Sequence, residues 1–351
     1  MTDQTQTQAR DYTFGLDTFG DISSAADGSP FSHADAIRAV VEQGALADEL
    51  GVDHFNIGEH HTTDFPMPAG DLVLGAIATR TSRIGLGSAV TVLSSDDPVR
   101  VFQRYSTLNA ISGGRAEVTL GRGSSTESFP LFGHDLADYD VLFDEKLSLF
   151  AEVLKGGPIT WEGTVRPPLH DQEVVPELDR PLPVWVGVGG NPNSVVRAAR
   201  YGFNLRLAVI GGPPDRFVPL TRLYTQAITG FGYGSRPVGI HSPGHIAPTD
   251  ERAIDEFWPH YLDMMTRMSR VRGFAIPTKE NFLHEVGPHG SLYVGSPDTV
   301  AQKMANTMRN LNAGRFDLKY AMGRLSEDRL RTNIELYGAE VVPKARKLLA
   351  G

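Results

Sequence analysis

The chain has 351 residues and contains no cysteine. Disulfide bonds, thiolate ligands for metals and cysteine nucleophiles are therefore excluded. The absence of cysteine fits a reducing compartment, so we expect a cytoplasmic protein. No apolar run approaches the roughly 20 residues of a transmembrane helix, and we expect no membrane partner. Residues 1–11 are mainly polar and lack the apolar stretch of a secretory signal, so we expect a disordered tail there.

Positive charge is also scarce. The formal net charge is −9 and the isoelectric point is about 5.7. General binding to nucleic acid needs a basic surface, so we expect no nucleic-acid partner. Hydrophobic residues make up 40% of the chain, which is enough for an extensive core. The length allows either one large barrel or two domains.

Strand-like and helix-like segments alternate along most of the chain. Apolar residues at helical spacing predict a helix over 31–51, for example, and an apolar run predicts a strand over 52–58. Eight such strands, each followed by a helix, favour a closed (β/α)₈ TIM barrel in the α/β class over an open sheet. The eight predicted strands cover residues 12–18, 52–58, 83–93, 114–123, 183–190, 203–210, 237–247 and 316–322.

Two segments interrupt this alternation. Residues 157–182 are rich in proline and glycine, which predicts an insertion after the fourth helix with one hairpin. Residues 271–296 have little periodicity, which predicts a long loop before the eighth helix, and such a loop could close as a lid. Because no second core is evident, we expect a single domain over residues 12–351.

In a barrel of this kind the active site lies where the strands end. The segment "NIGEHHTTDFP" (56–66) places Glu59, His60 and His61 at the end of the second strand. Successive residues of an extended chain point in opposite directions, so the two histidines are not expected to share a metal. A neutral histidine here is instead a candidate acid or base, or simply a ring bound to a backbone carbonyl. The other polar residues at strand ends include Asp17, Ser94, Ser95, Asp96, Asp97, Arg122, His241 and His245.

The turn "GVGGNPNS" (187–194) joins the fifth strand to a helix. Asn191 suits the N-cap of that helix, and the proline after it suits the first turn. The next two amides, of Asn193 and Ser194, would then be free to bind an anion, to which Arg122 could add a positive charge. The alternative is an ordinary capped helix beside a surface arginine.

The third strand contains the unusual run "GLGSAV" (85–90). Small residues in a strand allow a flat group to lie against the backbone, or they allow close packing inside a barrel. Both interpretations remain open at this point.

Several stretches, taken in order, resemble the bacterial luciferase-like family of flavin-dependent monooxygenases. They are "LADELGVDHFNIGEHHTTDF", "TSRIGLGSAVTVLSSDDPVR", "LNAISGGRAEVTLGRG", "VWVGVGGNPNSVVRAARYG" and "VGSPDTVAQKM". The resemblance implies the same (β/α)₈ barrel. It also implies an enzyme that binds reduced FMN or, in some branches of the family, a deazaflavin.

The same resemblance assigns roles to individual residues. His60 matches the catalytic histidine of luciferase, with Glu59 and His61 in support. The Ala89–Val90 peptide, which can be cis in the family, would lie against the flavin ring, and the remaining residues would hold the phosphate end. The implied cofactor-binding residues are Ala89, Val90, Arg122, Gly123, Ser124, Gly189, Gly190, Asn191 and Ser194.

This chain departs from luciferase at two positions. Luciferase has a reactive cysteine where this chain has Gly121, and an acidic residue where it has Gly190. Light emission is therefore not implied, and the substrate is an unidentified small organic molecule. The nicotinamide fingerprint GxGxxG does not follow any predicted strand, so a separate reductase would supply reduced flavin. The resemblance also implies a homodimer formed through the helices beside strands two and three.

Three other functions remain open from the sequence. A deazaflavin-dependent enzyme that transfers hydride could use the same fold. A metal-dependent barrel hydrolase could use His60, His61, His241 and His245. A non-catalytic flavin-binding protein could keep the phosphate site without needing His60.

Overall fold

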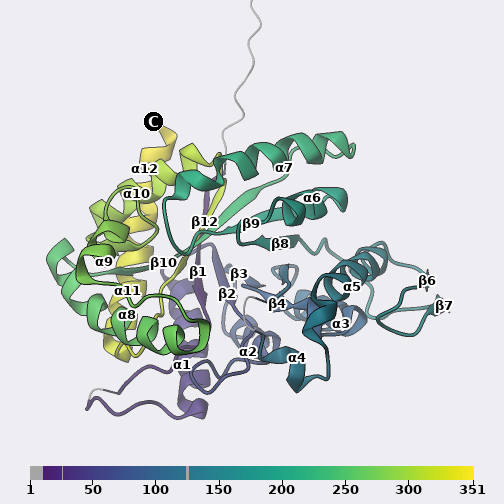
Figure 1. Cartoon of the computed structure of the whole chain (residues 1–351), viewed down its shortest axis with the longest axis horizontal. Coiled ribbons are helices and arrows are strands. Elements are labelled where there is room, and N and C mark those ends of the chain that lie inside the picture. Colours follow the sequence, from purple (N-terminus) through teal and green to yellow (C-terminus); the bar gives the residue numbers. More distant parts are fainter. Residues whose placement is uncertain (1–10, 26, 124–125) are drawn as a thin grey trace, which may run out of the picture.

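Parallel strands form a nearly closed barrel at the centre of the molecule, and helices surround it (Figure 1). The computed structural model describes residues 11–25, 27–123 and 126–351, so all but one residue of the predicted tail over 1–11 lies outside it. The strands are β1 Thr13–Thr18, β2 His54–Ile57, β3 Gly85–Ser88, β4 Thr91–Val92, β5 Val118–Gly121, β6 Ile159–Trp161, β7 Leu169–Gln172, β8 Val184–Val188, β9 Asn204–Ala208, β10 Val238–Ile246, β11 Tyr293–Gly295 and β12 Arg315–Lys319.

The helices lie between these strands along the chain. The α-helices are α1 His33–Glu49, α2 Gly70–Ala78, α3 Pro98–Ile111, α4 Ser128–Leu131, α5 Tyr139–Val153, α6 Pro192–Arg200, α7 Val218–Gly230, α8 Asp250–Arg272, α9 Lys279–Val286, α10 Pro297–Asn310, α11 Glu327–Leu336 and α12 Val342–Ala350. The short helical turns are η1 Leu93–Ser95, η2 Leu136–Asp138, η3 Pro214–Phe217 and η4 Tyr337–Val341. In the described part of the chain, no helix is both long enough and apolar enough to cross a membrane.

The sheet confirms the predicted barrel. Its strand order is β3-β2-β1-β12-β10-β9-β8-β5-β4, and all of these neighbours pair in parallel. The predicted third strand is divided into β3 and β4 by the Ala89–Val90 peptide bond, which is cis. A parallel bridge between Leu86 of β3 and Ala116, just before β5, brings the two ends of the sheet together.

The strands have an apolar outer face and a polar inner face. Leu16, on the outer face of β1, is fully buried under the helices, and its neighbour Asp17 points into the barrel and is also fully buried. Glycines make room for this polar interior, because a Cβ atom at Gly87 would lie 2.6 Å from Oδ1 of Asn56. The small residues of β3 at this level therefore serve close packing inside the barrel.

The hairpin predicted in 157–182 is confirmed as the antiparallel pair β6–β7, which follows the fourth barrel helix, α5. The expectation of an unstructured loop over 271–296 was wrong. That segment contains α9, and β11 extends the sheet by pairing with the end of β10. A capping box between Thr278 and Asn281 begins α9. The ammonium group of Lys303, on α10, lies within hydrogen-bond distance of the carbonyls of residues 285, 286 and 287 at the end of α9, and of residue 292 just before β11.

Candidate active site

The loop after β2 lies against the ends of two neighbouring strands. The amide of Gly58 donates to the carbonyl of Thr18, and the amide of Glu59 donates to the carbonyl of Val90, both at 2.9 Å. Gly58 has to be small, because a Cβ atom there would overlap the ring of Phe19 and lie 2.7 Å from the carbonyl oxygen of Ala89. The cis peptide and the Glu-His-His loop are therefore in direct contact at the mouth of the barrel.

His60 and His61 point to different surroundings, as the strand geometry predicted. Nδ1 of His60 lies 3.2 Å from Oε1 of Glu127, and its ring packs 4.7 Å from Phe19. Nε2 of His61 lies 2.8 Å from Oε1 of Glu59. The two adjacent histidines thus belong to two separate histidine–carboxylate pairs.

Glu127 is the direct partner of His60 and was missed in the sequence. The hydrogen bond from His60 lowers the pKa of Glu127, so this carboxylate stays ionised at neutral pH. A carboxylate that accepts the Nδ1–H bond leaves Nε2 of a neutral ring as the proton acceptor. In this arrangement Nε2 is the ring nitrogen of His60 at which a proton could be accepted.

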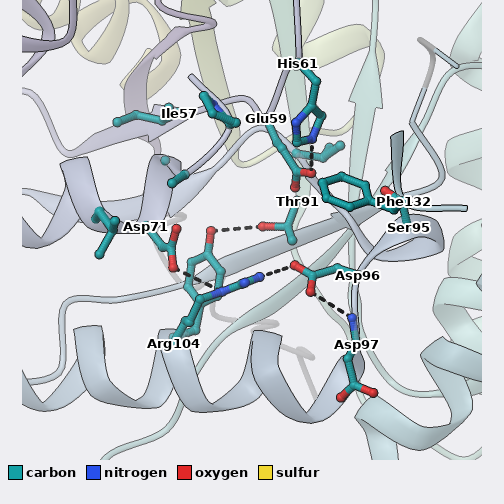
Figure 2. A pocket seen from close by; sticks show the side chains of 16 residues that line it. Ile57, Glu59, His61, Asp71, Thr91, Ser95, Asp96, Asp97, Arg104 and Phe132 are labelled. Atoms are coloured by element: carbon teal, nitrogen blue, oxygen red, sulfur yellow. Dashed lines mark hydrogen bonds and ion pairs between the residues drawn. The ribbon is translucent and has the colours of Figure 1, made fainter. Parts of the chain in front are cut away.

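Glu59 and His61 line a cavity of about 410 Å³ on the outer side of the barrel wall (Figure 2). The second carboxylate oxygen of Glu59 accepts from the amide of Val92 at 2.9 Å, which ties the pair to β4. Across the cavity, Arg104 lies between Asp71 and Asp96. The two residues expected to support His60 therefore contact each other and face this cavity.

The cis Ala89–Val90 peptide has the geometry that the resemblance implied. Its Val90 side chain fills the space above two glycines of neighbouring strands. A Cβ atom would lie 2.5 Å from a Val90 methyl at Gly121, and 2.9 Å from one at Gly187. The absence of a cysteine side chain at position 121 is thus a packing requirement of Val90.

The predicted phosphate site lies at the ends of β5 and β8, which are neighbours in the sheet. Asn191 is the N-cap of α6, as predicted, and its side chain accepts from the amide of Asn193 at 2.9 Å. The amide of Ser194 donates to the carbonyl of Asn191 at 3.1 Å. The prediction that both amides are free was therefore wrong, because the same capping residue binds them.

Two arginines flank this helix end, and both pair with α5. Arg122 donates to Asp140 at 2.7 Å and stacks over the ring of Tyr139. Arg197 pairs with Asp144 and also donates to Oγ of Ser194 at 3.3 Å. The region is rich in guanidinium groups, and Arg197 was not predicted.

The other predicted phosphate-site residues are glycines and a serine. Gly189 and Gly190 are exposed, and nothing lies within 4 Å of a Cβ atom at either position. The carbonyl of Gly123 accepts from the hydroxyl of Tyr139 at 2.7 Å. Ser124 lies outside the described residues.

The four histidines of the hydrolase hypothesis do not converge. His241 pairs with Asp17 at 2.5 Å, and His245 pairs with Glu256 at 2.9 Å. Together with the partners of His60 and His61, each ring has a carboxylate of its own. Within residues 11–25, 27–123 and 126–351, no three histidines or carboxylates are grouped as metal ligands.

The fold and this loop agree with a known family. The sequence profile of the luciferase-like monooxygenases matches residues 14–315, which is most of the chain. The protein therefore belongs to the luciferase-like monooxygenase family of oxidoreductases.

The individual relatives and solved structures described next share about a quarter or less of their residues with this chain. The 4-hydroxyprotoasukamycin monooxygenase of Streptomyces nodosus subsp. asukaensis is 26% identical over 324 residues, which cover 89% of this chain and 87% of the relative. Monooxygenase RslO1 from Streptomyces bottropensis superposes with a TM-score of 0.82 at 20% identity, over 94% of this chain and 99% of that one.

Two further structures contain different cofactors. The oxygenating constituent of 3,6-diketocamphane monooxygenase from Pseudomonas putida, solved with FMN, has a TM-score of 0.73 at 19% identity and covers 95% of this chain and 98% of that one. An F420-dependent secondary alcohol dehydrogenase, solved with an F420–acetone adduct, has a TM-score of 0.73 at 16% identity and covers 95% and 99%. At these identities the likeness shows the fold, and it leaves the choice of cofactor open.

Proposed function

We propose that the protein is a flavin-dependent monooxygenase that uses reduced FMN and O₂ to oxygenate a small organic substrate. The observation that carries the proposal is the contact between the His60 loop and the cis Ala89–Val90 peptide at the mouth of the barrel. This contact brings the loop that carries His60, the proposed proton-transfer residue, against the peptide that the family resemblance assigns to the flavin ring.

The residues present fit the phosphate end of FMN. Gly189 and Gly190 leave open space around the start of α6, and Arg122 directly follows β5, the strand next to β8. Asp140, its present partner, is 75% exposed, and an exposed ion pair is worth only about 0–1 kcal/mol. Arg122 can therefore exchange this carboxylate for a phosphate group at little cost, and Ser194 would add a hydroxyl group.

Bound reduced FMN would supply the two electrons that activate O₂. The chain itself would hold and move a proton at Nε2 of His60, while Glu127 fixes the orientation of the ring. Phe19 and Phe65 pack 4.7 and 5.1 Å from this ring and limit the access of water to it.

A first experiment tests the cofactor. We would titrate the purified protein separately with FMN and with deazaflavin F420, and compare wild type with Arg122→Met. A charged hydrogen bond is worth about 1.5–3 kcal/mol, so the variant should bind FMN about 10- to 100-fold more weakly. Arg331→Met, at an exposed pair with Glu335, is the matched control. Tight F420 binding without FMN binding would favour the hydride-transfer enzyme.

A second experiment tests His60. With reduced FMN supplied by a separate reductase, oxygen consumption by His60→Gln should fall about 10²- to 10⁴-fold if His60 is the acid or base. His61→Gln should have a much smaller effect, because His61 faces the outer cavity. Equal rates for wild type and His60→Gln would instead fit a protein that binds flavin without catalysis.

We also propose the setting in which the enzyme works. Residues 12–351 would form one domain of a cytoplasmic protein that depends on a separate flavin reductase. The exposed side chains of Leu72 and Phe132 form an apolar rim around the outer cavity beside α2 and α3. A second copy of the chain would cover this rim in a homodimer, and sedimentation of wild type against Leu72→Asp measures it.

A further inference from the structure

Charged side chains fill the interior of the barrel below the proposed site. Arg315 lies 2.7 Å from a carboxylate oxygen of Glu117 and 2.9 Å from one of Asp317. Arg206 lies 3.3 Å from Glu117 and 3.1 Å from Asp317. Asp17 joins the group through Asn56, which donates to it at 2.6 Å and to Asp317 at 3.2 Å. We call these six residues the barrel network.

The charges of the barrel network do not balance. It contains three carboxylates and only two guanidinium groups. Burial raises the pKa of Asp317, but Arg315 and Asn56 donate N–H groups to it and the Arg206 guanidinium lies 3.1 Å away, which favours the carboxylate. One negative charge is therefore left over, and a buried charge without a partner is costly.

His241 supplies the partner for that charge. Its Nδ1 lies 2.5 Å from Oδ2 of Asp17, while the other oxygen of Asp17 accepts from Asn56. The carboxylate is thereby fixed on both sides, and it fixes the imidazole in turn. When both ring nitrogens of His241 carry protons, the charges of the barrel network and His241 sum to zero.

The position of His241 links the barrel network to the proposed site. Asp17 is fully buried, whereas the side chain of His241 remains 8% exposed, so a proton can leave the pair only through the ring. The His241 ring stacks on the Phe19 ring with 5.9 Å between their centroids. The same Phe19 ring also packs against the ring of His60, at 4.7 Å. Both histidines therefore lie beside Phe19. His241 reaches it from inside the barrel, and His60 reaches it from the loop at the rim.

We propose that His241 is a second proton-transfer residue of this site, and that Asp17 is the residue that positions it. His241 donates the proton on Nε2 to an oxygen of the bound reactant. The electrons of the broken N–H bond stay on the ring nitrogen, a new O–H bond forms, and solvent later returns the proton. Asp17 remains a carboxylate throughout. The proposal rests on the proposed function, because it assumes a reactant at the barrel mouth.

The charged groups around His241 come from several strands. Asp17 faces it from β1, Asp317 is its register neighbour on β12, and Arg206 acts on Asp17 from β9. Lys319, also on β12, lies over Phe19 and pairs with Asp21 at 3.0 Å. These are the charged groups that face His241 or act on its partner Asp17.

The first test needs no flavin. Nitrogen-15 NMR of the imidazole side chains at pH 7 should show His241 with both nitrogens protonated in wild type, and neutral in Asp17→Asn. The signals are assigned with His241→Gln. A neutral His241 in the wild-type protein would overturn the proposal, whether or not the protein binds FMN. If Asp17→Asn does not fold, the wild-type spectrum alone decides the question.

The second test adds the reactant. Addition of reduced FMN should shift the His241 signals, and His241→Gln should slow flavin-dependent oxygen consumption about 100-fold. His245→Gln is the matched control, because His245 lies on the same strand, pairs with Glu256 and stacks on Phe257 of α8. Equal rates in the two variants, with no shift of the His241 signals when FMN binds, would refute the role of His241. Failure of wild type to bind FMN would instead refute the proposed function.

Discussion

Two histidine–carboxylate pairs contact the same phenylalanine, Phe19, and they differ mainly in what surrounds the carboxylate. Glu127, the partner of His60, precedes the short helix α4 and keeps 24% of its side chain exposed. Asp17, the partner of His241, has no exposed surface and is bound into the barrel network. The histidine–carboxylate pair at the rim thus stands apart from the barrel network, whereas the pair in the interior is bound to it.

The largest effect is expected from breaking the barrel network. Arg315→Met leaves Glu117 and Asp317 without their main cation, so it should lower the free energy of unfolding by about 3–5 kcal/mol. Urea denaturation measures the change. At the exposed pair with Glu335, Arg331→Met should cost no more than about 1 kcal/mol. Similar losses in the two variants would mean that the interior charges are not a special feature of stability.

An intermediate effect should appear in acid. Burial raises the pKa of Glu117, but the charge of the Arg315 guanidinium is the largest of the effects that lower it. The net pKa of Glu117 falls from 4.5 to about 2. This carboxylate therefore contributes stability that is complete above pH 4.5 and is lost as the pH falls towards 2. The loss is about 3 kcal/mol. Glu117→Gln should flatten the stability curve in this pH window, as measured by urea denaturation at several pH values.

The rim carboxylate gives the contrast in the same experiment. The pKa of Glu127 is also lowered, by its hydrogen bond with His60, but the group is partly exposed. Glu127→Gln should therefore leave the acid limb of the stability curve almost unchanged. An equal flattening by both variants would remove the distinction between rim and interior.

The smallest effect on stability, and a clear effect on activity, is expected for Glu127→Gln at neutral pH. The free energy of unfolding should change by less than about 1 kcal/mol, because the pair is near the surface. Flavin-dependent oxygen consumption should fall about tenfold, because His60 loses the acceptor that orients its ring. Glu152→Gln, at an exposed pair with Lys155, is the control. An unchanged rate would show that Glu127 does not position His60.

The sequence predicted those features that depend on local periodicity. The strands and helices of the barrel, the opposite directions of His60 and His61, and the cap at Asn191 all follow from spacing within a few residues. The helix α9 was missed although the capping box of Thr278 and Asn281 marks its start locally, and the contacts that hold its end come from Lys303 of another helix.

Pairs of residues distant in the sequence could not be predicted in this way. Asp17 and His241 are 224 positions apart, and their contact depends on the register of β10 and β1 against β12. Glu127 and His60 lie in two separate loops, 67 positions apart in the sequence. One signal was available, because Asp317 and Lys319 alternate with apolar residues in their strand, which indicates a polar barrel interior.

The packing of Val90 over Gly121 and Gly187 has a consequence for comparing and redesigning these enzymes. A side chain at position 121 and a branched side chain at position 90 compete for one volume, so neither position can be exchanged between relatives alone. The residue that fits at position 121 thus depends on the side chain at position 90, which comes from another part of the barrel. Transplanting a luciferase-type cysteine into this barrel requires a simultaneous reduction of Val90, a coupled replacement that a residue-by-residue graft would miss.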